Sequence, residues 1–261
     1  MKTLISNPLA NLKKTLQKVA VATLCILFKF CLFASVLHAQ TTEKITWDYP
    51  IKPDSIGWNQ CNSPDEINEK LNIPENILKD LDTESLVQIC LDYPALSVFF
   101  LTDAPQQGFD VFFSKFNGIR ELMSREDVGH FLLQKYSRMS MADFNFLWSL
   151  EKQGDFVFRF YHAEIFLAQP QSIQSLDDSD RSLLLKESIR KYELKESRDD
   201  LFGGISRSTT TWVLAKSLHA ENKLQVNLSD VPRIEHSLQS GDVSGFDVRY
   251  LIQQAKKYAN E

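Results

Sequence analysis

The sequence has 261 residues, of which 43% are hydrophobic and 24% are charged, with 9 Gly, 9 Pro and 4 Cys. This is the composition of a globular protein, and it excludes disordered, fibrous and disulfide-dense chains. A mean hydropathy of −0.23 excludes a polytopic membrane protein, and the low glycine content disfavours glycine-cradled nucleotide sites and turn-rich β folds.

Residues 1–39 have the pattern of an export signal. They contain no Asp or Glu, and four lysines within the first 18 residues precede two apolar runs that are separated by Lys29. A basic region, an apolar region and the small residue Ala39 before Gln40 predict a signal peptide that is cleaved after Ala39. The alternative is an uncleaved anchor in the inner membrane, because residues 19–39 are long enough to cross a bilayer. In both cases we expect the rest of the chain outside the cytoplasm, in the periplasm or the medium.

Residues 40–62 show neither a helical nor a strand period. We interpret them as an extended leader that lies on the following domain. A single all-α domain is predicted for residues 63–261. It begins at Ser63, where a serine cap, a proline at the first helical position and a glutamate at N3 predict a short helix to about Leu71.

Helix signals recur along the rest of the chain. They are capping residues and prolines at helix starts, and apolar side chains at i, i+3, i+4 and i+7. Residues 156–168 also fit a strand alternation, but their length and helical surroundings favour a helix. Residues 199–208, with Gly203 and Gly204, are predicted as a loop. Further helices are predicted from Pro74 to about Leu81, from Asp82 or Thr83 to Pro94, from Pro105 to a stop at Asn117–Gly118, from 124–127 onward, from 140–143 to Gly154, over 156–168, from Asp177 to about Glu196, from Thr209 to Glu221, from Asp230 to Gly241, and from Ser244, with Asp247 at N3, onward.

These elements predict an all-α fold of about ten short to medium helices, packed as an irregular array of helical hairpins. No repeat with a period of 30 to 45 residues is present, so a regular solenoid is not supported. Of the 18 phenylalanines, 13 lie between Phe99 and Phe166. Their helical spacing favours a hydrophobic core, and the alternative is a pocket for a cofactor or a lipid.

The exported chain is acidic. Removing residues 1–39 takes five lysines from the 29 basic side chains and none from the 34 acidic ones, so the net charge becomes about −10. Such a surface repels phosphate backbones and anionic lipid headgroups. We therefore expect no nucleic-acid partner and, after signal cleavage, no membrane association.

Two cysteines, Cys61 and Cys90, remain after the signal. In an oxidising compartment they could form a disulfide, which closes a loop of about 30 residues and stabilises the fold by roughly 3–4 kcal/mol. The alternative is a pair of free thiols. Cys90 lies on the apolar face of a predicted helix, where free cysteine is common. The sequence leaves both states open.

Metal-binding spacings are missing from the sequence. No paired histidines, His-Glu-x-x-His or Cys-x-x-Cys motif occurs. His162 and Glu164, like His219 and Glu221, are two residues apart and would point to different sides of a helix. Residues 242–253 match a calcium-binding loop only loosely, because several ligand positions are filled by unsuitable residues.

Catalytic motifs are missing as well. Ser206 lies in a glycine-containing segment, 203–208, but that segment is not a nucleophile elbow and no strand precedes it. We interpret the segment as a loop between helices in which Ser206 or Ser208 caps the following helix. We therefore predict no catalytic residue, no cofactor and no metal ligand, and we expect a protein that is not an enzyme.

Three short segments resemble a family of uncharacterised exported α-helical proteins from Bacteroidota-type bacteria. They are Ile73-Pro74-Glu75, the helix end TESLVQICLDYPAL at 83–96, and Phe116-Asn117-Gly118. The resemblance covers about residues 72–215, and the Ala39–Gln40 junction is also typical of the family. It implies export and an α-helical domain, and it transfers no catalytic residue because no activity is known. Members carry a cysteine just before the Ile-Pro segment, whereas Cys61 lies twelve residues earlier, so a shared disulfide is in doubt.

We expect a non-enzymatic exported protein that binds protein partners in the cell envelope or stabilises an envelope assembly. One alternative is an exported hydrolase with a site around Ser206, His162 or His219. A second alternative is a carrier whose phenylalanine-rich central helices enclose a small apolar ligand.

Overall fold

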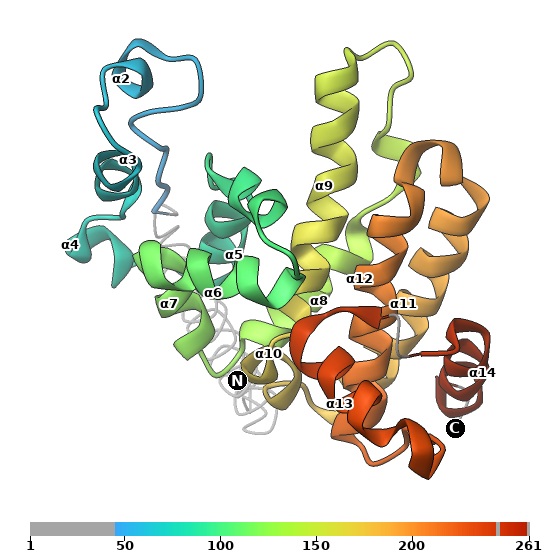
Figure 1. The fold of residues 1–261 in the computed structure, drawn as a ribbon. Helices are drawn as coiled ribbons and strands as arrows, with labels where there is room; N and C mark the ends of the chain where they lie inside the picture. The colour runs from blue at the N-terminus through green and yellow to red at the C-terminus, as the bar shows by residue number, and fades with distance from the viewer. Residues whose placement is uncertain (1–44, 244–245, 260–261) are drawn as a thin grey trace, which may run out of the picture. The chain divides into compact units, whose positions relative to one another are not determined.

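The computed structural model of the chain describes residues 45–243 and 246–259, and within these ranges it contains thirteen α-helices, three 3-10 helices and no β-strand (Figure 1). The all-α prediction is confirmed. The predicted signal or anchor over 1–39 and the predicted cap at Ser244 lie outside the described residues. The elements are α2 (Ile56–Asn59), α3 (Pro64–Leu71), α4 (Glu75–Leu78), α5 (Thr83–Leu91), η1 (Leu96–Leu101), α6 (Pro105–Lys115), α7 (Asn117–Ser124), α8 (Val128–Arg138), η2 (Met141–Asp143), α9 (Leu150–Leu167), α10 (Pro170–Gln174), α11 (Asp178–Ser197), α12 (Asp199–Ala220), η3 (Leu228–Asp230), α13 (Val231–Ser240) and α14 (Val248–Ala259).

The three longest helices, α9, α11 and α12, form the centre of the array. α11 and α12 fold back on each other at Arg198 as a hairpin, which is orange in Figure 1, and the yellow-green α9 packs against α12. α14 packs against α11, and α8 packs against α9. None of the helices within the described ranges is both long enough and apolar enough to cross a membrane.

Many of the clustered phenylalanines form a core, as their spacing predicted. Phe99, Phe112, Phe116 and Phe166 are buried. The rings of Phe112 and Phe166 stack with their centroids 5.7 Å apart, and other pairs meet edge to face, which is the geometry that aromatic rings favour. The core interpretation does not hold for Phe146, whose side chain is exposed.

The described part of the leader packs on the helices. Tyr49 and Ile51 are buried, and the Tyr49 hydroxyl donates a 2.8 Å hydrogen bond to the carbonyl oxygen of Ile89 in α5. The segment also contains the short helix α2, which the sequence did not predict because its four residues are too few to show a period.

Asn117 and Gly118 begin a helix, which corrects their prediction as a stop that reverses the chain. The Asn117 side chain accepts a hydrogen bond from the Ile73 backbone N–H at 2.9 Å and donates one to the Ile73 carbonyl at 2.7 Å. Gly118 is required because a Cβ atom there would collide with the ring of Phe116. The pair therefore joins α6 to α7 and holds the chain before α4 in place.

Gly154 lies inside α9, although the sequence predicted that a helix would end there. A glycine inside a helix costs only about 1 kcal/mol relative to alanine, and the 18-residue helix around it tolerates that cost. Residues 140–149 consequently form η2 and a turn rather than the start of a helix. The helix predicted over 156–168 is confirmed as the second half of α9.

Residues 199–208 are helical rather than a loop. Only Gly203 departs from helical dihedral angles, with φ 60° and ψ −178°, and it forms a kink inside α12. The Ser208 hydroxyl donates back to the carbonyl of Gly204, so Ser208 lies within the helix and does not cap it. Asp247 caps α14 directly, because its carboxylate accepts hydrogen bonds from the backbone N–H groups of Arg249 and Tyr250.

Candidate functional site

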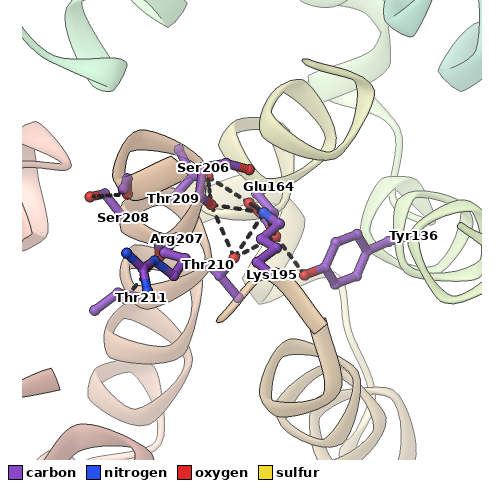
Figure 2. Close-up of polar contacts among 10 residues, drawn as sticks. Tyr136, Glu164, Lys195, Ser206, Arg207, Ser208, Thr209, Thr210 and Thr211 are labelled. Atoms are coloured by element: carbon purple, nitrogen blue, oxygen red, sulfur yellow. Dashed lines mark hydrogen bonds and ion pairs between the residues drawn. The ribbon is translucent and has the colours of Figure 1, made fainter. Parts of the chain in front are cut away.

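A buried ion pair lies where α8, α9, α11 and α12 meet (Figure 2). Glu164 of α9 and Lys195 of α11 have no exposed side-chain surface. The Lys195 ammonium donates to both carboxylate oxygens of Glu164, at 2.8 Å and 2.7 Å. A buried charge is tolerated only when it is paired and its remaining hydrogen-bonding capacity is filled.

Three hydroxyl groups complete the surroundings of the Glu164 carboxylate. Tyr136 of α8 donates to Oε1 at 2.7 Å, and Thr210 of α12 lies 2.8 Å from the same oxygen. The hydroxyl of Thr209 lies 2.5 Å from Oε2. In Figure 2 these hydroxyls, which come from α8 and α12, and the ammonium of Lys195 from α11 converge on Glu164. We call Tyr136, Glu164, Lys195, Thr209 and Thr210 the Glu164 cluster.

Lys195 also contacts the backbone of α12 just after the kink. Its ammonium donates to the carbonyl oxygen of Ser206 at 2.8 Å and to the hydroxyl of Thr210 at 3.0 Å. Burial lowers the pKa of Lys195, and burial together with the negative charge of Glu164 raises the pKa of Tyr136. The charged groups satisfy one another, and their hydrogen bonds hold α8, α9, α11 and α12 together.

A second lysine, Lys191, is buried one turn before Lys195. Its ammonium donates to the carbonyl oxygen of Met139 and lies 5.2 Å from the centre of the Tyr136 ring. The carboxylate of Glu187 is 3.8 Å away. Burial lowers the pKa of Lys191 to about 8, so this side chain changes charge within reach of ordinary experimental conditions.

An apolar cleft opens beside the Glu164 cluster. Its walls are residues 150–161 of α9 and residues 200–206 of α12, and its volume is about 500 Å³. Leu150 is 85% exposed, Ile205 69% and Phe158 38%. We call this feature the α9–α12 cleft.

The exposed apolar surface continues past the mouth of the cleft. Phe146 and Leu147, 67% and 92% exposed, come just before α9. The guanidinium of Arg198 lies 5.1 Å from the centre of the Phe146 ring and also binds Asp200, which lines the cleft. Phe146 therefore lies next to the start of α12.

The Glu164 cluster determines the position of one cleft wall. Ser206 ends the stretch of α12 that lines the cleft, and its carbonyl oxygen is the atom that Lys195 holds. A Cβ atom on Gly203 or Gly204 would meet no other atom within 4 Å. Gly203 is half-buried and Gly204 is exposed, whereas Ser206 in the following turn is buried and its carbonyl oxygen accepts the hydrogen bond from Lys195.

Two further hollows adjoin the cleft and share residues with it. The first flanking hollow, of about 680 Å³, lies between α5, the leader and α9, and shares Phe158 with the cleft. The second flanking hollow, of about 640 Å³, lies near the start of α6 and the segment after α13, and shares Tyr161 and Ile205 with the cleft. The three hollows therefore form a connected surface.

The structure does not bring Ser206, His162 and His219 together. Ser206 lines the cleft and His162 lines the first flanking hollow. His219 is exposed near the end of α12, thirteen residues after Ser206, which corresponds to about 20 Å along a helix. Burial lowers the pKa of His162 to about 3, so its ring is neutral at physiological pH.

Cys61 and Cys90 are both free thiols in the structure. Cys90 is fully buried, and burial raises the pKa of its thiol. Cys61 is partly exposed, and its sulfur accepts a hydrogen bond from Lys70 at 3.4 Å. Their pairing in an oxidising compartment stays a prediction. Among the residues that the structure describes, no group of three His, Cys, Asp or Glu side chains could hold a metal ion.

Sequence reasoning missed the Glu164 cluster and the cleft. One signal was present, because Glu164 is a lone acid within an apolar stretch of α9. A second was the pair Lys191 and Lys195, which lie four residues apart on one face of α11 with buried apolar side chains. Neither signal shows which residues bind Glu164 or the two lysines. The cleft has no signal in the sequence, because it is formed by tertiary packing.

No protein-family model matches this chain, and neither a curated protein nor a solved structure is significantly similar to it. The resemblance to exported Bacteroidota-type proteins therefore stays a prediction.

Proposed function

We propose that this protein is a non-enzymatic, exported binding module that takes up an apolar segment of a partner protein in the α9–α12 cleft. The observation that carries the proposal is the exposure of Leu150, Phe158 and Ile205 around one open cleft. Single exposed apolar side chains are ordinary, but several at one hollow mark an interaction site.

The shape of the cleft favours a polypeptide as its occupant. Sites for small molecules enclose most of the ligand surface, whereas Leu150 and Ile205 are mostly exposed. An extended or helical segment can place a row of apolar side chains along such a groove and leave its other face in water. Phe146 and Leu147 add apolar surface next to the groove.

Site-specific photo-crosslinking in the native host tests this proposal. A photoreactive side chain replaces Ile205 in the cleft or, as a control, Leu228, which is 92% exposed in η3 and does not line the cleft. We expect a protein adduct of defined mass from position 205 and little from position 228. Adding Leu150→Asp should remove the adduct at 205, because a carboxylate in the cleft opposes apolar binding.

Two results would contradict the proposal. One is an equal pattern of adducts from both positions. The other is an adduct at position 205 that persists unchanged when Leu150→Asp is present. Circular dichroism and urea unfolding of each variant establish that the fold is retained.

A further inference from the structure

The connected surface around the α9–α12 cleft is strongly acidic. Two cationic side chains line its three hollows, a third, Arg198, binds Asp200 at the mouth of the cleft, and all three contact aspartates. Lys52 lies 3.0 Å from Asp48, and Arg159 lies 3.5 Å from Asp92. The six aspartates that line the three hollows are Asp48, Asp92, Asp103, Asp155, Asp200 and Asp242.

This charge is a local feature and not only a reflection of the acidic chain. Six aspartates against three cations, with Arg198 counted beside Asp200, leave a net charge of −3 on the connected surface. The hollow between α11 and α14 is different, because it contains three cationic side chains, Lys186, Arg190 and Lys256, and a single acid, Glu193. Positive and negative hollows therefore lie on different parts of the molecule.

We infer that the occupant of the α9–α12 cleft is a basic apolar segment, in which lysine or arginine side chains flank apolar anchors. The inference rests on the proposed function and names its partner chemistry. Apolar side chains would contact Leu150, Phe158 and Ile205. Cationic side chains on either side of them would reach the two flanking hollows, where exposed Asp155 and Asp103 lie.

Two physical effects support a basic partner. Carboxylates beside a low-dielectric apolar wall attract cations more strongly than carboxylates on an open surface. An acidic segment would bring like charges together as it entered the cleft, which opposes binding. The same repulsion disfavours a second copy of this chain, because the acidic surface of one copy would face that of the other.

Three labelled peptides test the inference by fluorescence anisotropy with the purified protein. They share the same leucine positions and carry lysine, glutamine or glutamate at all remaining positions. We expect the lysine peptide to bind at least about 10-fold more tightly than the glutamine peptide at low salt, and the glutamate peptide to bind weakest. High salt should reduce these differences, because it screens exposed charges.

Substitutions locate the binding. Asp155→Asn and Asp103→Asn should each weaken binding of the lysine peptide by a few fold. Asp178→Asn, on the exposed start of α11, should leave that binding unchanged. Leu150→Asp is the sharper control. This substitution adds a negative charge and removes an apolar contact. If the lysine peptide binds by non-specific electrostatic attraction, its affinity should increase, and if it binds in the cleft, its affinity should decrease.

The outcomes separate this inference from the proposed function. If the three peptides bind equally and Leu150→Asp weakens all of them, the preference for a basic segment is wrong and apolar binding in the cleft stands. If the lysine peptide does not bind, or binds more tightly to Leu150→Asp, the inference is also wrong. Crosslinking from position 205 then decides the proposed function separately.

Discussion

Glu164 illustrates how a charge is maintained in the interior of this protein. Its carboxylate accepts hydrogen bonds from an ammonium group and from hydroxyl groups on two other helices. Removing one member of such a pair leaves an uncompensated buried charge, whereas removing both charges can be nearly neutral. The free energy of unfolding should therefore respond very differently to single and double substitutions.

We predict that Glu164→Gln and Lys195→Met each lower the free energy of unfolding by about 3–5 kcal/mol. The double variant should lose clearly less than the sum of the two single losses, because neither charge is then left alone. Urea unfolding of the four proteins measures this. Additive losses would show that the two side chains are not energetically coupled.

Lys191 gives a prediction about pH. Burial lowers its pKa to about 8 in the folded protein, against a usual value of 10.5. Between these two values the unfolded chain binds more protons than the folded chain, so the free energy of unfolding rises with pH. The contribution is at most about 1.4 kcal/mol per pH unit.

Comparison with Lys191→Met isolates this contribution. From about pH 7 to about pH 10 the wild type should gain stability relative to the variant, as measured by urea unfolding at each pH. If the difference between the two proteins stays constant over this range, Lys191 keeps its charge in the folded state.

For single residues such as Glu164, the sequence indicates that the side chain is buried but not which side chains bind it. Glu164 is an acid in an apolar stretch, which signals an unusual environment. Its partners, however, lie 28, 31, 45 and 46 residues away along the chain. Only the packing of four helices brings them together, and no local pattern encodes that packing.

At the scale of helices, α12 is divided by its kink into a short first turn and a long second part. Gly203 has φ 60° and ψ −178°, a conformation that is essentially restricted to glycine. Gly204, the next residue, has helical dihedral angles and open space around its Cα atom. The two glycines therefore have different structural roles.

Substitution by alanine should separate these roles. Gly203→Ala should lower the free energy of unfolding by about 1–3 kcal/mol because of backbone strain. Gly204→Ala should leave it unchanged or raise it by up to about 1 kcal/mol, because alanine favours a helix. Chemical denaturation of both variants measures the effect. Equal losses from the two substitutions would mean that the kink does not depend on the conformation of Gly203.

Helix starts that carry a capping side chain, such as Ser63 and Asp177, were predicted well, whereas the starts predicted at 140–143 and Thr209 and the glycine-containing junctions were not. Ser63 and Asp177 cap helices as their sequences indicate, because a cap acts on backbone groups only three residues away. The sequence predicts a helix stop at Asn117 and a loop around Gly203. In the structure Asn117 begins α7 and bonds the backbone of Ile73, and Gly203 forms a kink within α12, which continues beyond it. Both outcomes depend on tertiary neighbours.

At the scale of the whole molecule, the all-α fold followed from the sequence because helix periods and caps extend over most of the chain. The α9–α12 cleft did not follow, since its walls come from residues 150–161 and 200–206, which are separated by some forty residues. In the sequence, an apolar residue that is exposed on a helix cannot be distinguished from one in the core, because only the packing of the helices decides which is buried.

The oxidation state of Cys61 and Cys90 gives a prediction for the whole molecule. Both cysteines of the described domain are free in the structure, one partly exposed and one buried. If they remain reduced, Cys61 should react with a thiol reagent in the folded protein and Cys90 only after unfolding. Mass spectrometry after alkylation identifies the labelled residue. Protection of both thiols under denaturing, non-reducing conditions would instead demonstrate a disulfide.

The hydrogen bond from Tyr49 to α5 also limits how far an exopeptidase can trim the chain from its N-terminal side. Ile45 is 41% exposed, whereas Tyr49 and Ile51 are each only 7% exposed. An exopeptidase that trims the chain from its beginning can therefore remove exposed residues easily, but it must pull an aromatic ring out of the core to proceed past Tyr49. Treatment of the purified protein with an aminopeptidase should therefore stop just ahead of Tyr49, and mass spectrometry of the product measures this.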